Sequence, residues 1–300
     1  MAEQVPLSKA ARADDPAYDK ARNDETHEVA PDVAYQRLAL VNVAYVGVPG
    51  SNEWVLIDTG VPGTARFIKA AAAARFGKES RPAAIVITHG HFDHVGALET
   101  LAREWDVPVY AHIHELPYLD GRAAYPPPDP SVGGGIMSTL SPLFPRGPVD
   151  VSPWLRELPL DGTVPGMPGW KWVATPGHTP GHVSLWRASD RMLIAGDAFI
   201  TTRQESAYGA WTQAPEMHGP PMYFTQDWEA SRRSVEALAA LEPEVAVTGH
   251  GRAMRGEELR AALATLARDF DRVAVPEHGR YVAEPARVET RTAYEPTRNR

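Results

Sequence analysis

The sequence predicts an α/β fold in which some strands run parallel. Two short apolar runs, residues 54–57 and 84–87, are rich in β-branched side chains and are bounded by turn-forming residues, as strands are. The Ala-rich segment 64–76 between them has the composition of a helix, and Gly77 directly after it suits a helix end. Strand, helix and strand in this order form a βαβ unit, which implies parallel pairing.

Further strands and helices are expected along the rest of the chain. We expect strands at residues 38–48, 54–57, 84–87, 107–111, 170–174, 183–187, 191–195 and 244–247. We expect helices at residues 64–76, 99–105, 231–241 and 257–271. Residues 1–30 are polar and charged and predict a mobile arm or one short surface helix, so we place a single domain at residues 31–300.

One long stretch, residues 121–169, lacks this regularity. It contains Tyr125-Pro-Pro-Pro, Gly133-Gly-Gly and many further Pro and Gly residues. A stretch of this length without periodicity is usually functional or mobile, and the alternative is a solvated connector.

Composition narrows the class of protein. The 300 residues are 43% hydrophobic and 23% charged, which is typical of a globular chain. The absence of cysteine excludes disulfides, thiolate zinc sites and cysteine nucleophiles. A net charge of −8 argues against a nucleic-acid surface, and no apolar run approaches the roughly 20 residues of a membrane span. The N-terminus lacks the apolar core of a secretory signal, so we expect a soluble, cytoplasmic enzyme or binding protein without nucleic-acid or membrane partners.

A cluster of histidines follows the predicted strand 84–87. The segment Thr88-His89-Gly90-His91-Phe92-Asp93-His94 places three His and one Asp within six residues. Residues two apart at a strand end point to the same side, so His89 and His91 can aim at one point. Imidazole and carboxylate bind Zn²⁺ and similar metals, and packing does not explain four such groups this close. The alternative is an exposed polar loop.

Three later side chains have the same setting, because each follows a predicted strand. They are His178 in Thr175-Pro-Gly-His178, Asp197 in Gly196-Asp197, and His250 in Thr248-Gly-His250-Gly. Sites in open α/β sheets form where strand ends meet loops, so these side chains are expected to meet the histidine cluster. Seven ligands exceed the needs of one tetrahedral ion and suit two divalent ions.

The order H-x-H-x-D-H, T-P-G-H, G-D and G-H-G resembles the metallo-β-lactamase-fold superfamily of metallohydrolases, over about residues 30–255. The resemblance implies an αββα sandwich with the metals at one edge. It implies that His89, His91 and His178 hold the first metal, that Asp93, His94 and His250 hold the second, and that Asp197 bridges both. Asp58, in Ile57-Asp58-Thr59-Gly60, matches a further family element that orients the ligand loop; the alternative is a turn residue.

Two metal ions would supply hydrolytic chemistry. They lower the pKa of bound water from about 15.7 toward about 7 and give a hydroxide that attacks a carbonyl or phosphorus atom. Asp93 or Asp197 could accept or relay the proton. Zinc is favoured, although the ligand set does not separate it from manganese or iron. We expect hydrolysis of a small carboxyl ester, lactone or thioester. The alternatives are a phosphodiesterase or phosphotriesterase, and a metal-binding or mono-iron redox protein.

Departures from the subfamilies narrow the substrate by exclusion. Thiolate-ligated β-lactamases need a cysteine, and flavodiiron proteins carry Glu where His91 stands. Glyoxalase II proteins add a helical C-terminal domain, whereas the chain after Arg272 is short. Signal-lactone hydrolases carry a Tyr shortly after the bridging Asp, whereas Ala198, Phe199 and Ile200 follow here. The resemblance is to the glyoxalase II and lactonase-like branch of the superfamily, and these departures leave the subfamily unresolved.

The remaining histidines and aromatic residues have weaker interpretations. His182, in a near repeat of the ligand motif, is expected to be structural, and His112 and His114 are expected at the surface or in hydrogen bonds. The aromatic loop 208–224 is expected to wall a pocket for a neutral small-molecule substrate, with residues 125–137 as a second wall. The alternatives for this loop are a core patch or a homodimer contact. Its candidate residues are Tyr208, Trp211, Met217, His218, Met222, Tyr223 and Phe224.

Overall fold

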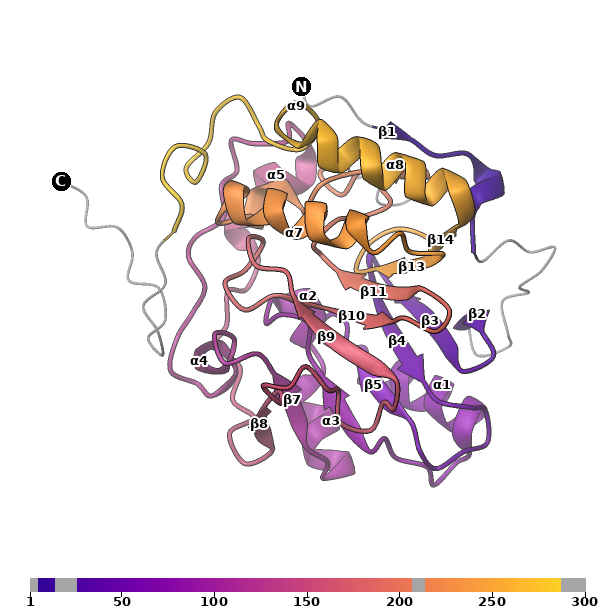
Figure 1. The fold of residues 1–300 in the computed structure, drawn as a ribbon. Helices are drawn as coiled ribbons and strands as arrows, with labels where there is room; N and C mark the ends of the chain where they lie inside the picture. Colours follow the sequence, from indigo (N-terminus) through magenta and orange to yellow (C-terminus); the bar gives the residue numbers. More distant parts are fainter. Residues whose placement is uncertain (1–4, 14–25, 207–213, 287–300) are drawn as a thin grey trace.

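The computed structural model describes residues 5–13, 26–206 and 214–286. Two sheets pack face to face, and helices cover the outer face of each (Figure 1). This is the αββα sandwich expected from the sequence.

The seven-stranded sheet has the strand order β2-β3-β4-β5-β6-β7-β8. Its strands are β2 (Thr26–Ala30), β3 (Val33–Leu38), β4 (Val41–Val46), β5 (Val55–Ile57), β6 (Ala84–Val86), β7 (Val109–Ala111) and β8 (Leu155–Glu157). Strands β2 to β5 pair antiparallel and β5 to β8 pair parallel. Helices α1 (Ala65–Phe76) and α3 (Leu98–Trp105) cover its outer face. The predicted βαβ unit is β5, α1 and β6.

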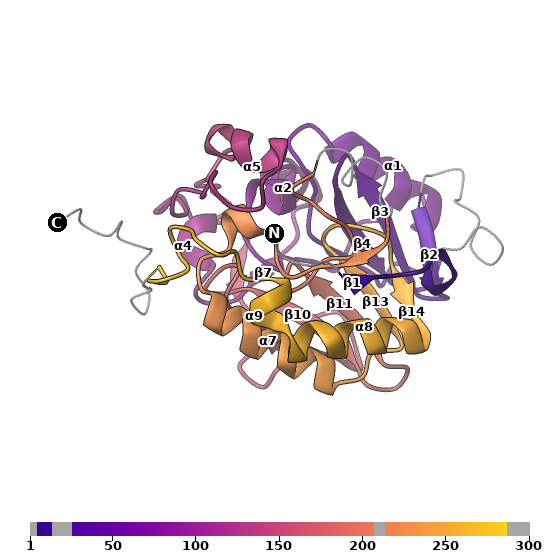
Figure 2. The same cartoon turned by 90° about the horizontal axis from the view of Figure 1, so that it is seen from above.

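The five-stranded sheet has the order β14-β13-β11-β10-β9. Its strands are β9 (Trp170–Ala174), β10 (Val183–Arg187), β11 (Met192–Gly196), β13 (Val245–Thr248) and β14 (Met254–Arg255). Its outer face packs against α7 (Trp228–Ala240) and α8 (Gly256–Arg268). These two helices lie side by side in Figures 1 and 2, and α9 (Phe270–Val273) follows them.

The core between the sheets follows from the alternation of side chains along each strand. In β5, Val55 and Ile57 face the second sheet, whereas Leu56 between them faces α1 and α3. In β11, Ile194 faces the first sheet, and Leu193 faces α7 and α8. Both faces of the central strands β5 and β11 are therefore buried, which leaves the strand ends and their loops to form a site.

Several short elements lie in the loops. They are α2 (Phe92–Val95), α4 (Leu116–Leu119), α5 (Ile136–Leu140), η2 (Ser141–Leu143), β12 (Glu216–Met217) and η3 (Met222–Phe224). Near the N-terminus, β1 (Val5–Pro6) pairs with β12, η1 (Lys9–Ala11) follows, and Leu7 and Ala11 are buried in the core beneath α8. The first sheet begins at Thr26. The division of the chain at residue 30 stays a prediction.

The structure differs from the predicted elements in several places. Strands β2, β14 and all of β3 except Leu38 lie outside the predicted strands, and the predicted helix 257–271 is divided into α8 and α9. Residues 38–48 were expected as one strand but contain the last residue of β3, a hairpin turn and β4, because the chain turns at Ala39, whose φ is 60°. No Gly, Asn or Pro marks this turn in the sequence. Within residues 121–169, the three residues of β8 extend the sheet, and they are too few to produce a periodic pattern.

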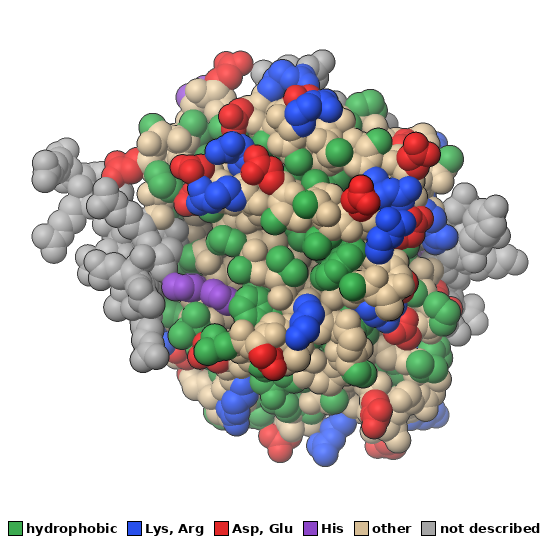
Figure 3. Space-filling view, in the orientation of Figure 1, with side chains coloured by type: hydrophobic (Ala, Val, Ile, Leu, Met, Phe, Trp, Pro, Cys, Tyr) green, Lys and Arg blue, Asp and Glu red, His purple; other side chains and the backbone are tan. Residues whose placement is uncertain are grey.

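The surface carries charges of both signs. On the face drawn in Figure 3, acidic and basic side chains are interspersed. Among the helices of the described residues, none is long and apolar enough to cross a membrane.

Candidate metal centre

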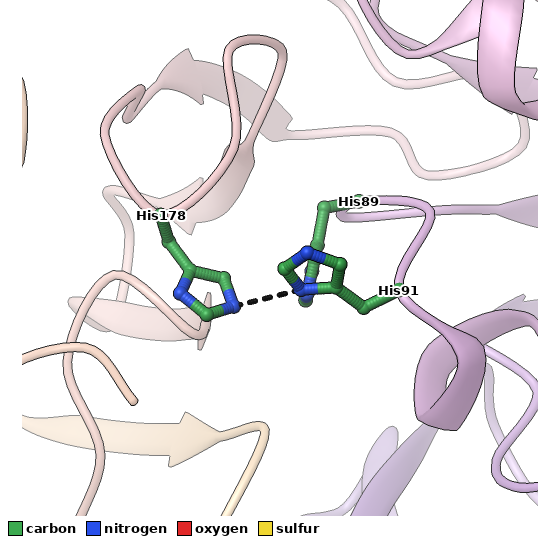
Figure 4. Close-up of side chains that lie close together, drawn as sticks. All are labelled: His89, His91 and His178. Carbon is green, nitrogen blue, oxygen red and sulfur yellow. Dashed lines mark hydrogen bonds between the residues drawn. The ribbon is translucent and has the colours of Figure 1, made fainter. Parts of the chain in front are cut away.

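The seven predicted ligands come from four strand ends. His89 and His91 lie in the loop after β6, Asp93 and His94 lie in α2, His178 follows β9, Asp197 directly follows β11, and His250 follows β13. All except Asp93 are at most 3% exposed. Figure 4 shows His178 reaching toward His89 and His91 from the opposite loop. The structure therefore brings together residues that lie up to 161 positions apart, as the strand ends predicted.

The ligand atoms fall into three overlapping groups, each within 4.8 Å. The groups are His89, His91 and His178; His89, His94 and Asp197; and Asp93, His94 and His250. In the first group, His91 Nδ1 lies 3.0 Å from His178 Nε2 (Figure 4). The first and third groups have no residue in common, and the second group shares His89 with the first and His94 with the third.

Asp197 lies at the centre of the cluster. Its Oδ2 is 3.4 Å from His178 Nε2 and 3.2 Å from His250 Nε2, and its Oδ1 is 3.5 Å from His94 Nε2. On the other side, Asp93 Oδ2 is 3.4 Å from His250 Nε2. One carboxylate therefore faces imidazoles from both expected ligand sets, as a bridging ligand would.

The hydrogen bonds of the rings leave ligand nitrogens free to face the cluster. Nδ1 of four rings lies near an oxygen atom: His89 near Thr88 Oγ1, His94 near Asp58 Oδ2, His178 near Thr225 Oγ1 and His250 near the Leu40 carbonyl oxygen. The two hydroxyls donate elsewhere, Thr88 to Asp58 and Thr225 to the Pro221 carbonyl, so each of the four rings donates from Nδ1. The Nε2 atom of each ring then faces the cluster, where it can bind metal once it carries no proton.

Buried atoms without a hydrogen bond test whether metal ions fit. His89 Nε2, His94 Nε2 and Asp197 Oδ1 are buried and make no hydrogen bond. Unpaired buried polar atoms are costly, and nitrogen and carboxylate oxygen are the donors that zinc and similar ions bind. The residues present therefore fit divalent metal ions.

Burial keeps part of the cluster uncharged. Burial, and next the neighbouring imidazoles, hold the pKa values of His89 and His178 well below their usual range. Burial also lowers the pKa of His91 to about 3. These three rings are the expected ligands of the first metal, and they are neutral at physiological pH, which is the form that binds metal.

The carboxylates favour the protonated, positively charged form of His94 and His250, which belong to the second expected ligand set. Burial lowers the pKa of His250, but Asp197 and Asp93 outweigh it and raise that pKa to about 10. In the same way Asp197 and Asp58 raise the pKa of His94 against the effect of burial. Burial opposes ionisation of Asp197, but His250 and His94 hold its pKa well below the usual range. Metal ions would replace protons here, so binding would release protons.

Comparison with known proteins agrees with this geometry. The family model described as "Metallo-beta-lactamase superfamily" matches residues 37–250. The chain belongs to the metallo-beta-lactamase superfamily. It is 46% identical over 247 residues to the probable metallo-hydrolase YflN of Bacillus subtilis (strain 168), covering 82% of this chain and 94% of YflN.

One further relative supports the same assignment, and a solved structure shares the fold. The probable metallo-hydrolase YybB of Bacillus subtilis (strain 168) is 30% identical over 204 residues, covering 68% of this chain and 78% of YybB. The crystal structure of a B3 metallo-beta-lactamase with an active-site glutamic acid superposes with a TM-score of 0.57 at 20% identity, covering 90% of this chain and 96% of that one. This last likeness concerns the fold. The chain is a metallohydrolase of the metallo-beta-lactamase fold.

Asp58 holds the start of the ligand loop in this superfamily member. Its Oδ1 accepts the Thr88 amide at 2.8 Å, and its Oδ2 lies 2.7 Å from both Thr88 Oγ1 and His94 Nδ1. Asp58 has a φ of 60°, which is unusual for a residue other than glycine. Its contacts favour the expected orienting role over that of a simple turn residue.

His182 holds the backbone of Asp197. Its Nε2 accepts the Asp197 amide at 2.9 Å, and its Nδ1 lies 2.8 Å from Thr175 Oγ1. Gly196 has a φ of 55°, and a Cβ there would lie 2.6 Å from His182 Nε2, so the position needs glycine. His182 belongs to none of the three ligand groups, in line with the structural role expected for it.

Aromatic rings flank His91 from the two stretches expected to wall the pocket. The rings of Tyr125 and Phe224 each lie 4.6 Å from the His91 ring. Tyr208 and Trp211 lie outside the described residues, and the wall of the substrate pocket stays a prediction. His112 and His114, expected at the surface or in hydrogen bonds, stack on each other at 5.1 Å.

Sequence reasoning missed the buried residue Glu115. Its carboxylate lies behind the ligand loops and accepts four hydrogen bonds from them and from Tyr125. A single Glu after the histidines at 112 and 114 forms no motif. Burial raises its pKa, and the hydrogen bonds oppose the rise.

Proposed function

We propose that this metallohydrolase holds two divalent metal ions, with zinc favoured, and cleaves a small carboxyl ester, lactone or thioester. The observation that carries the proposal is the arrangement of three ligand groups around Asp197, with both expected ligand sets within its reach. His89, His91 and His178 would hold one ion, and Asp93, His94 and His250 the other, with Asp197 between them.

The metal ions would activate water and polarise the substrate oxygen. The chain's own residues supply orientation and proton handling. Asp93 is the more exposed carboxylate, with 15% of its side chain accessible against 3% for Asp197. Burial opposes its ionisation, but the hydrogen bond from His250 lowers its pKa, so Asp93 is ionised and has an oxygen that can accept a proton. Asp197 is deeper and suits the bridging position.

The surroundings of the cluster favour a neutral, partly apolar substrate. Phe224 and Tyr125 pack on His91, and Tyr223 beside Phe224 is buried. Apolar walls of this kind suit an acyl chain or lactone ring. The net charge of −8 disfavours polyanions. The proposal therefore includes a small-molecule partner in the cytoplasm, without nucleic acid or membrane, and a homodimer as the alternative use of the aromatic loop.

A substrate screen tests the proposal. Protein loaded with zinc, and separately with manganese, is assayed on lactones, esters, thioesters, phosphodiesters and a chromogenic cephalosporin, with elemental analysis of the same samples. We expect about two ions per chain and turnover confined to the carboxyl esters, lactones or thioesters. The matched control is His89→Ala. This variant should bind less metal than the parent protein and should show no turnover. Turnover of phosphodiesters alone, or a stable single ion with full activity, would contradict the proposal.

A further inference from the structure

Glu115 occupies a buried position between two loops of the metal centre. It follows β7, directly precedes α4, and is fully buried. Its Oε2 accepts the Gly90 amide at 2.9 Å and the Tyr125 hydroxyl, and its Oε1 accepts Thr179 Oγ1 and the Gly181 amide, both at 2.8 Å. Four donors therefore meet the two oxygens of one carboxylate.

The positions of these donors relate Glu115 to the candidate ligands. Gly90 lies between His89 and His91, and Thr179 directly follows His178. One half of the carboxylate thus holds the loop after β6, and the other half holds the loop after β9. These are the two loops whose rings approach to 3.0 Å at His91 Nδ1 and His178 Nε2.

Close packing supports the same link independently of the hydrogen bonds. A Cβ at Gly90 would lie 2.7 Å from the Tyr125 hydroxyl, and a Cβ at Gly181 would lie 2.8 Å from the Glu115 Cγ. Each loop therefore approaches the Glu115 and Tyr125 pair at a glycine, where any side chain would force the loop away. The Tyr125 ring also packs between His91, at 4.6 Å, and Tyr118, at 3.8 Å.

We propose that Glu115 is a positioning residue for the metal centre, which holds the two loops at the separation where His89, His91 and His178 bind one metal ion. The proposal rests on the metal centre of the proposed function but not on its substrate. Because the carboxylate contacts the loop of His178 and not the loop of His250, its loss should weaken the first metal position more than the second.

The chemistry of the contact explains why a carboxylate is needed. Two ionised oxygens offer about four acceptor sites, and each of the four partners donates. In Glu115→Gln the amide nitrogen would itself donate. It would face the backbone amide of Gly90 or Gly181, which can only donate, so one of the two loops loses that attachment while the shape of the side chain is kept. Residues that orient metal ligands change metal affinity by about 10–100-fold when they are replaced.

Zinc competition with a chromophoric chelator tests the proposal without any substrate. We expect two zinc-binding steps in the competition curve, one abolished in His178→Ala and the other abolished in His250→Ala. Glu115→Gln should weaken the step that His178→Ala abolishes by about 10–100-fold and should leave the other step unchanged. The matched control is Asp129→Asn, which alters a buried carboxylate that accepts the Ser131 and Arg280 amides. It should lower the melting temperature and leave both zinc affinities unchanged.

Four results would overturn the proposal: unchanged zinc affinities in Glu115→Gln, equal losses in both steps, the same loss in Asp129→Asn, or a parent protein that binds no zinc. If Glu115→Gln does not fold, Thr179→Val removes one of the four hydrogen bonds and should give a smaller loss in the same step; no loss would overturn the proposal. A parent that binds two zinc ions but hydrolyses no carboxyl substrate would contradict the proposed substrate class alone.

Discussion

Histidines with the same burial and similar motifs have different tasks in this site, and their hydrogen bonds distinguish them. His250 donates from Nδ1 to the Leu40 carbonyl oxygen and directs Nε2 at Asp93 and Asp197. His182 uses both nitrogens within the protein, one on the Asp197 amide and one on Thr175. His250 therefore has a nitrogen free for metal, and His182 has none.

This difference predicts opposite outcomes for two alanine variants. His250→Ala should lose about one metal ion per chain and keep its fold, because the second ligand set loses a member. His182→Ala should keep both ions and lose about 1–3 kcal/mol of unfolding free energy, because the buried Asp197 amide loses its acceptor. Elemental analysis and chemical denaturation of both variants measure the two effects. Loss of metal from His182→Ala would mean that the two histidines of the repeated motif are misassigned.

At this scale the sequence predicted which histidine and aspartate side chains lie together, but it did not predict Glu115. The histidine and aspartate side chains form a recognisable pattern because several follow one strand and the others follow similar strands. Glu115 has no such pattern, since its partners Gly90 and Gly181 lie 25 and 66 positions away. Only the packed loops reveal that its four hydrogen bonds converge.

Among the elements, the short helix η3 connects the aromatic loop to the ligands. It places Phe224 4.6 Å from the His91 ring and 6.3 Å from the Phe92 ring, which precedes Asp93. The sequence predicted a wall here from composition alone. It could not decide which aromatic residues face the ligands, because the loop has no periodicity to fix their directions.

Phe224→Leu tests whether η3 forms the substrate wall. The variant should raise KM for apolar acyl substrates several-fold, corresponding to about 1 kcal/mol of lost apolar contact, while metal content stays constant. Phe270→Leu is the control, because Phe270 lies in the same core cluster but in α9. A changed mass in light scattering with an unchanged KM would instead favour a dimer contact. If neither the mass nor KM changes, Phe224 belongs neither to a substrate wall nor to a dimer contact.

Apart from residues 38–48, each predicted strand was recovered with ends within two residues of the prediction. The hairpin at Ala39 and the edge strand β8 were missed because their signals are tertiary. The hairpin also has a part in the site, since its Leu40 carbonyl oxygen holds His250. The turn at Ala39 has no turn-forming residue, and its contact with His250 comes from a distant part of the chain, so a local sequence pattern does not reveal it.

For the whole molecule, the metal centre joins the two sheets. Each ligand group combines residues after β6, in the seven-stranded sheet, with a residue after β9, β11 or β13 of the five-stranded sheet. Metal ions bound there would therefore crosslink the two halves of the sandwich. Without them, the buried cluster keeps polar atoms that have no partner, such as His89 Nε2 and Asp197 Oδ1.

Removal of metal should consequently destabilise the sandwich as a whole. A ligand present at about 100 times its Kd stabilises the folded state by about 2.7 kcal/mol, so each bound ion should raise the melting temperature of a chain of this size by about 4 °C. Calorimetry of chelator-treated protein before and after zinc addition measures this shift. Hydrogen exchange should slow on zinc binding in loops of both sheets and change little in the remote helix α1. Slower hydrogen exchange in the loops of one sheet alone would mean that the ions do not span the two halves. An equal melting temperature with and without zinc would mean that the protein residues alone hold the sheets together at this edge.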